Sequence, residues 1–142
     1  MWLRCHRASS NWLGRRVPDC GLWHLTDGVI QEPLASSPNG SYGTLVWKDT
    51  TPNQTPDWVE LEFFAAVTAG RIAVYPAENT LRDYEVQAQI NGKWQTLGSV
   101  KNAQGKSQEI KFAPVQAKVF RLYVTAANGP TCKVHEIEIY EK

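Results

Sequence analysis

The stretch Trp58-Val-Glu-Leu-Glu-Phe-Phe64 alternates apolar and acidic side chains before it ends in two phenylalanines. Successive side chains of a β-strand point to opposite faces of the sheet, so Val59, Leu61 and Phe63 share one face and the two glutamates share the other. A strand with one apolar and one charged face covers a core on one side and meets water on the other. The stretch therefore predicts a half-buried strand of an antiparallel sheet.

The same alternation recurs along most of the chain. Further strands are predicted at 43–47, 71–75, 83–90, 93–97, 107–112, 119–125 and 133–141. Asn91-Gly92 is a two-residue turn signal that joins two of these strands in a hairpin. Pro114 is expected to end the strand before it. In the last strand the apolar period slips by one residue at His135-Glu136, which predicts a β-bulge.

No segment shows a sustained apolar period of 3.6 residues, and clusters of Gly, Pro and Asn separate the strands. This pattern is typical of an all-β fold, an antiparallel β-sandwich of the jelly-roll type. A length of 142 residues suits one domain with a single core, which we place at 1–142. Residues 31–54 lack the pattern and are expected to be mostly loop, and a loop of such length is usually functional or mobile.

Composition excludes several classes of protein. With 15 Lys and Arg against 14 Asp and Glu, the net charge is +1, which argues against a general nucleic-acid binder. The hydrophobic content of 42% is too high for a disordered chain. No apolar run approaches the ~20 residues of a transmembrane helix, and no apolar signal-peptide segment follows Met1. We expect Met1 to begin a fragment of a longer protein rather than an export signal.

The sequence contains no recognisable catalytic or zinc-binding motif. It contains no Gly-x-Ser-x-Gly elbow, and its Cys and His positions lack paired zinc spacing. We therefore expect a protein that is not an enzyme. Three cysteines leave at least one unpaired. Two alternatives stay open: three reduced thiols, or one bridge, either Cys5–Cys132 or Cys20–Cys132.

Short motifs follow one another over nearly the whole chain. In order they are Ala8-Ser-Ser10, Leu25-Thr-Asp-Gly28, an isolated Trp47, Pro56-Asp-Trp-Val-Glu-Leu-Glu-Phe63, Leu81-Arg-Asp-Tyr-Glu-Val86, Asn91-Gly-Lys-Trp94, Phe120-Arg-Leu122 and His135-Glu-Ile-Glu-Ile139. Their order resembles the discoidin domain, also called the coagulation factor 5/8 type C domain. This domain is a galactose-binding-like jelly roll and a close relative of the family 32 carbohydrate-binding modules. The chain departs from the family in a long insertion between Gly28 and Trp47 and in an Arg-rich start.

The resemblance implies a fold without catalytic machinery, in which the function comes from the loops. It implies a non-catalytic carbohydrate-binding module that recognises a glycan through loops at one end of the sandwich. Such a module would be monomeric as an isolated domain, part of a larger extracellular or periplasmic polypeptide and accessory to a glycoside-active enzyme. One alternative is an adhesion domain that binds a protein or a membrane surface. Another is a domain that only packs against the catalytic domain of its enzyme.

Three loop residues are candidates for contact with the sugar. Tyr42 lies in a Gly-flanked loop where packing does not demand an aromatic ring, so it is expected to stack on the apolar face of a sugar. Asn79 and Asn128 are further loop candidates, although Asn128 also suits a simple turn. Trp47 matches a family tryptophan that is usually structural, and we expect it in the core.

Arg82 is the fourth candidate for the carbohydrate site. Family members with sugar affinity often place an Arg or Asn at this position, and the fixed donors of a guanidinium suit vicinal hydroxyls. The alternative is a surface ion pair with Glu78 or Asp83.

The resemblance also implies a structural calcium ion, held by Asp27 of the Asp-Gly turn and by Glu136 of the last strand. Ca²⁺ takes six to eight oxygen ligands, so two carboxylates and the carbonyls of an irregular loop suit it. Gly28 would allow the tight turn, and the slipped period would aim Glu136 at the ion. The alternative is that Asp27 caps its own turn and Glu136 is an ordinary exposed residue.

Overall fold

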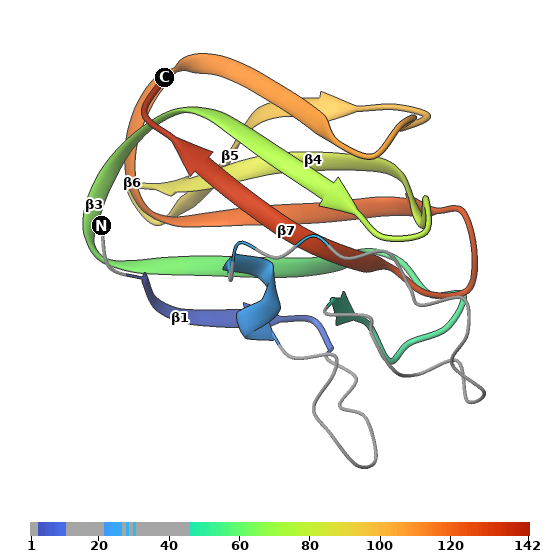
Figure 1. Cartoon of the computed structure of the whole chain (residues 1–142). Coiled ribbons are helices and arrows are strands. Elements are labelled where there is room, and N and C mark those ends of the chain that lie inside the picture. Colours follow the sequence, from blue (N-terminus) through green and yellow to red (C-terminus); the bar gives the residue numbers. More distant parts are fainter. Residues whose placement is uncertain (1–2, 11–21, 27, 29, 31–45) are drawn as a thin grey trace.

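The computed structural model (Figure 1) describes residues 3–10, 22–26, 28, 30 and 46–142. Its elements are β1 (Leu3–Ala8), a short 3-10 helix η1 (Leu22–Thr26), β2 (Trp47–Lys48), β3 (Asp57–Pro76), β4 (Leu81–Ile90), β5 (Lys93–Val100), β6 (Gln108–Ala127) and β7 (Lys133–Tyr140). All strand pairs are antiparallel, and the predicted all-β sandwich is confirmed. Within the described ranges, no helix is long and apolar enough to cross a membrane.

Two long strands, β3 and β6, build both layers of the sandwich. They pair with each other along most of their length and curl together at one end of the molecule (Figure 1). One layer contains β1, the first half of β3, the second half of β6, β4 and β5, whereas β2, β7 and the remaining halves form the other. The strands predicted at 58–64 and 71–75 are therefore two halves of one bent strand.

The expectation that Pro114 ends a strand is wrong, because β6 continues through it. The strand can continue because the pairing register between β3 and β6 shifts at this point. The β3–β6 ladder shifts between Ala69 and Arg71, where Val115 and Lys111 are the successive partners, so Pro114 lies in an irregular part of the ladder. A proline has no N–H to donate and is tolerated at such an irregularity.

The alternating apolar positions fill the space between the layers, as the sequence predicts. Val59, Leu61 and Phe63 are all buried, and the Phe63 ring meets the Phe120 ring edge-on with centroids 6.1 Å apart. Trp47 is also fully buried, and its indole N–H donates to the Ser10 carbonyl at 2.9 Å. Trp47 is therefore structural, as expected.

The strand β1 was not expected from the sequence; it pairs with β3 in the same layer, and its arginines reach the acidic face of β3. Arg7 donates to Glu60 at 3.1 Å and to Glu62 at 2.8 Å, and Arg4 donates to Glu62 at 3.2 Å. The side chains of both glutamates are only 13% exposed. The acidic face that alternation assigns to water is thus largely covered by arginines from the start of the chain.

The structure answers the question of the cysteines for two of the three. Cys5 and Cys132 are free thiols, so neither is part of a bridge. The Cys5 thiol donates to Glu62 at 3.3 Å, whereas Cys132 is buried immediately before β7. Cys20 lies outside the described residues.

Candidate functional site

The loops that carry the candidate residues converge at one end of the sandwich. Because β3 and β6 bend at the opposite end, their first and last residues come together here (Figure 1). Backbone hydrogen bonds tie loops that are far apart in the sequence: Asn53 N–H donates to the Pro130 carbonyl at 2.7 Å, and Asn128 N–H to the Thr80 carbonyl at 2.8 Å. The loops at this end of the sandwich therefore form one connected surface rather than a set of independent turns.

A hollow of about 320 Å³ opens between these loops and the adjoining strand ends. It is lined by residues 53–55, Arg82, residues 125–127, residues 129–130 and Cys132. Most of the lining side chains that can interact with a ligand are amides, hydroxyls or the guanidinium. The volume falls in the range of ~300–1,000 Å³ that is typical of small-molecule sites.

Two β-bulges aim side chains into the hollow. Leu81 pairs with Ala127 and Asp83 pairs with Ala126, so Arg82 is left without a cross-strand partner. Thr125 of β6 also has no partner across the strands, because the next pair joins Tyr84 to Val124. A bulged residue leaves the regular alternation, and its side chain can be turned toward a site. Both bulged residues line the hollow.

Arg82 makes the ion pair that was its alternative role. Its Nε lies 3.6 Å from Asp83 Oδ2, whereas Glu78 pairs with Lys133. The Asn102 backbone N–H, with Arg82 and Lys101 nearby, holds the pKa of Asp83 below its usual range. The Arg82 side chain remains 49% exposed. An exposed pair of this length holds a guanidinium only weakly, so the ion pair and a contact with a ligand are compatible.

The two asparagine candidates support the turn that precedes Arg82. Asn128 Nδ2 donates to the Asn79 carbonyl at 3.1 Å and to the Leu81 carbonyl at 3.4 Å. The structure thus brings Asn79 and Asn128 together, but neither is among the described residues that line the hollow. Tyr42 lies outside the described residues.

The predicted calcium ligand Glu136 is buried, which excludes the alternative of an ordinary exposed residue. The predicted bulge is confirmed: Tyr75 pairs with Glu136 and Pro76 with Val134, so His135 is skipped. Both carboxylate oxygens of Glu136 accept from Gly28 N–H, at 3.1 and 3.2 Å. The turn after η1 therefore lies against Glu136, although Asp27 itself lies outside the described residues.

A second group of acids, not predicted from the sequence, lies beneath the floor of the hollow. Asp49, Asp57 and Cys132 are each at most 2% exposed, and their ligand atoms lie within 4.8 Å of one another. The cluster could hold a metal ion. Its thiol suits a softer metal than calcium, which prefers oxygen ligands. The cluster therefore does not fit the predicted calcium ion.

Hydrogen bonds already engage the carboxylates of this cluster. Asp57 Oδ1 accepts from Ser9 Oγ at 3.0 Å and from Thr51 Oγ1 at 3.1 Å. Asp49 accepts from the backbone N–H of Thr51 at 2.9 Å and from that of Cys132. The buried acids thus join the loop after β2 to the segment that leads into β7, and both segments line the hollow.

Burial changes the acid–base behaviour of the cluster. Burial, together with the charge of Asp49, raises the pKa of Asp57 above its usual range. Burial and the two carboxylates also raise the pKa of the Cys132 thiol far above its usual range. A thiol of this kind stays protonated at neutral pH and is a poor nucleophile. The buried Cys132 thiol is therefore not a ready nucleophile.

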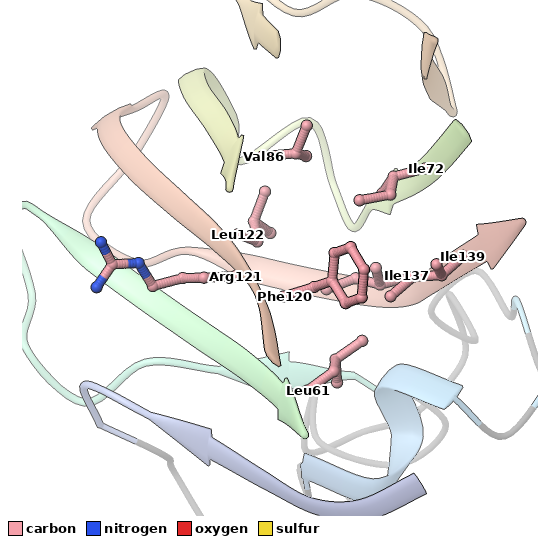
Figure 2. A pocket seen from close by; sticks show the side chains of 8 residues that line it. All are labelled: Leu61, Ile72, Val86, Phe120, Arg121, Leu122, Ile137 and Ile139. Atoms are coloured by element: carbon pink, nitrogen blue, oxygen red, sulfur yellow. The ribbon is translucent and has the colours of Figure 1, made fainter. Parts of the chain in front are cut away.

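A cavity inside the sandwich is not a second ligand site. It lies between side chains of both layers, which Figure 2 shows facing one another. Its volume is about 10 Å³, no more than the space that one water molecule occupies. Arg121 points away from the apolar group (Figure 2), and its guanidinium lies 3.9 Å from the centre of the Trp94 ring. The cavity is therefore part of the core.

Comparison with known proteins agrees with this architecture. The sequence profile of the F5/8 type C domain matches residues 27–137. A search of curated proteins finds no match. Among solved structures, chitosan-binding module 1 of a chitosanase/glucanase from Paenibacillus sp. IK-5 has a TM-score of 0.73 and 19% sequence identity, over 96% of this chain and 93% of that chain.

Two further solved structures show the same fold. The family 32 module of NanJ from C. perfringens, in complex with galactose, has a TM-score of 0.72 and 17% identity, over 96% of this chain and 93% of that chain. A GH29 fucosidase from Ruminococcus gnavus, in complex with fucose, has a TM-score of 0.71 and 12% identity. That match covers 96% of this chain and 25% of the fucosidase. The bent two-layer sandwich and the profile match over most of the chain together show that it belongs to the F5/8 type C domain family.

Proposed function

We propose that this chain is a non-catalytic carbohydrate-binding module that holds a sugar in the hollow beside Arg82. The observation that carries the proposal is the bulge that turns Arg82 into a polar hollow at the loop end. A guanidinium offers fixed donors that match neighbouring sugar oxygens. The amides of Asn53 and Gln54 and the hydroxyl of Thr125 supply further donors and acceptors around it.

The solved relatives support the class of ligand and the setting. Two of them are carbohydrate-binding modules, one of which holds galactose, and another is an enzyme of which this fold covers only a quarter. By analogy, we expect the present domain to be monomeric on its own and to hold a larger extracellular or periplasmic glycoside-active enzyme near its glycan.

The distribution of apolar surface favours this function over an adhesion domain that inserts into a membrane. Such a domain would carry large apolar side chains at its loop tips. The exposed large apolar residues in the described part of the chain are Ile30 and Phe64. Phe64 lies in the bend of β3, at the end of the sandwich opposite the hollow.

A structural calcium ion at the Asp27–Glu136 turn belongs to the same proposal. Support comes from the burial of the Glu136 carboxylate beside the Asp-Gly turn and from the φ of 76° at Gly28. Glycine adopts this left-handed conformation without strain, which permits a tight turn. Asp27 and Glu136 would supply the carboxylate ligands, and the ion would fix the turn against β7.

The binding experiment is calorimetric titration of the folded protein with a broad panel of mono- and oligosaccharides. Arg82→Gln should weaken binding at least about tenfold, the equivalent of one lost charge-assisted hydrogen bond. Gly129→Leu tests the hollow independently, because a Cβ at Gly129 meets no atom within 4 Å and a larger side chain would occupy the ligand space.

Arg4→Gln is the matched control for Arg82→Gln. The Arg4 side chain is 53% exposed and pairs with one carboxylate at 3.2 Å, so it resembles Arg82 in exposure and pairing but lies on β1. The control should bind sugar like the parent protein. Absence of binding across the whole panel, with protein shown to be folded, would rule out the proposed function.

A further inference from the structure

The charge of the side chains that line the hollow indicates which chemical class of sugar it can bind. Of the described residues that line it, Arg82 is the one with a formal charge, and the others offer amides, hydroxyls, backbone groups or small apolar surface. No aromatic ring is among these described lining residues. A ligand in this part of the hollow is therefore recognised by charge and hydrogen bonds rather than by stacking on a ring.

The neighbouring acids offset this charge only in part and are not presented to a ligand. Asp83 Oδ2 lies 3.6 Å from Arg82 Nε, but Asp83 is not among the lining residues and its Oδ1 accepts from the Asn102 backbone N–H at 3.0 Å. Asp49 and Asp57 lie beneath the floor with exposures of 1% and 2%, so a ligand cannot touch them. The Arg82 guanidinium is half-exposed and open to direct contact.

The bulge and the turn before it fix the backbone from which Arg82 extends. Arg82 has no cross-strand partner, and the turn before it is fastened through Asn128 to the carbonyls of Asn79 and Leu81. A guanidinium that extends from a fixed backbone can form two parallel hydrogen bonds to a carboxylate, and the attraction between opposite charges strengthens both bonds. Vicinal hydroxyls can occupy the same two donors, but they lack the charge.

We propose that the hollow selects sugars that carry a carboxylate, with Arg82 as the partner of that group. This inference rests on the proposed function, because it names the ligand class of the same site. Uronic acids and sialic acids share the required chemistry. They differ in the position of the carboxylate on the ring, so a panel that contains both tells them apart.

The test compares acidic sugars with neutral counterparts of the same shape. Galacturonate is paired with galactose and glucuronate with glucose, and N-acetylneuraminate is added to the panel. At low salt the acidic sugar of a pair should bind at least about tenfold more tightly. Raising NaCl from about 50 mM to about 500 mM should weaken that binding several-fold and leave the neutral sugar nearly unaffected, because salt screens an exposed ion pair.

Substitutions separate charge from shape. Arg82→Gln should abolish the preference for the acidic sugar, whereas Arg82→Lys should keep the salt dependence with weaker binding, because a lysine retains the charge without the two parallel donors. Arg4→Gln should leave the preference unchanged. Equal or tighter binding of the neutral sugars would overturn the inference and leave the proposed function intact. Failure of every sugar to bind would overturn both.

Discussion

Replacing Asp57 with asparagine should stabilise the protein at neutral pH. Asp57 and Asp49 are both buried, and their oxygens lie within 4.8 Å of each other. Two full charges at that distance repel each other by about 3.5 kcal/mol at an effective dielectric constant of about 20. Asp57→Asn removes the repulsion and keeps an oxygen to accept from the Ser9 and Thr51 hydroxyls. We expect the free energy of unfolding at pH 7.5 to rise by about 1 to 3 kcal/mol.

The stability gained by Asp57→Asn should increase as the pH rises from 4 toward neutrality. The pKa of Asp57 is raised in the folded state, so the folded protein binds more protons than the unfolded chain between the two pKa values. The contribution of Asp57 to stability is therefore fully present below the unfolded pKa of ~3.9 and is lost as the pH rises through the folded pKa. The advantage of the variant should accordingly be largest near neutrality and shrink toward pH 4.

Asp49→Asn is the matched control, because it removes the same charge from the same pair. The two oxygens of Asp49 accept from two different backbone N–H groups, those of Thr51 and Cys132. An asparagine would turn its NH₂ group toward one of these donors and leave a buried N–H unpaired, at a cost of about 1 to 3 kcal/mol. This variant should gain much less than Asp57→Asn or lose stability.

The assay is urea unfolding of the parent and both variants between pH 4 and pH 8, with a reductant present to keep the thiols free. If Asp57→Asn lowers stability at pH 7.5 as much as Asp49→Asn does, repulsion within the pair is not the dominant energy at this site. A constant difference between variant and parent across the pH range would equally contradict the shifted titration of Asp57.

Two further predictions concern the backbone and the metal. Gly70→Ala should lower the melting temperature, because its Cβ would lie 2.7 Å from the Glu141 carbonyl oxygen, whereas Gly129→Ala places its Cβ in open space and should leave stability nearly unchanged. Equal melting temperatures for the two variants would contradict this packing. Removing calcium with EDTA should lower the melting temperature and resupply should restore it, since an ion that binds only the folded state stabilises it. Asp27→Ala or Glu136→Ala should abolish that response, and a melting curve that is the same with and without calcium would count against the site.

Alternation along the sequence was enough to predict which side of most strands faces the core. Val59, Leu61 and Phe63 are buried as their spacing predicts, and the slipped period at His135 marks a real bulge. Both features follow from local geometry, because the direction of a side chain alternates along an extended backbone whatever the partner strand is. For the same reason the class of fold could be predicted without any knowledge of the partners.

Which strands pair with each other was harder to predict from the sequence. The start of the chain showed no apolar alternation, and it became β1 because it pairs with β3, whose glutamates meet Arg4 and Arg7 from more than fifty positions away. In the same way, the sequence showed two short strands where β3 is one bent strand, since the bend depends on how β3 and β6 pair with each other. Such pairings are properties of two segments together, and no single window of sequence contains them.

The candidate site, by contrast, depends on contacts between segments that are far apart in the sequence. The sequence left Arg82 divided between an ion pair and a ligand contact, and the structure assigns it a place in the hollow while keeping the pair with Asp83. Its orientation depends on the register between β4 and β6, which leaves Arg82 unpaired. The hollow itself needs residues 53–55 beside residues 129–130, and the buried acids hold these segments in place from below. A binding surface assembled from distant loops exists only when the whole sandwich has formed, because its geometry is set by registers and hydrogen bonds between segments rather than within them.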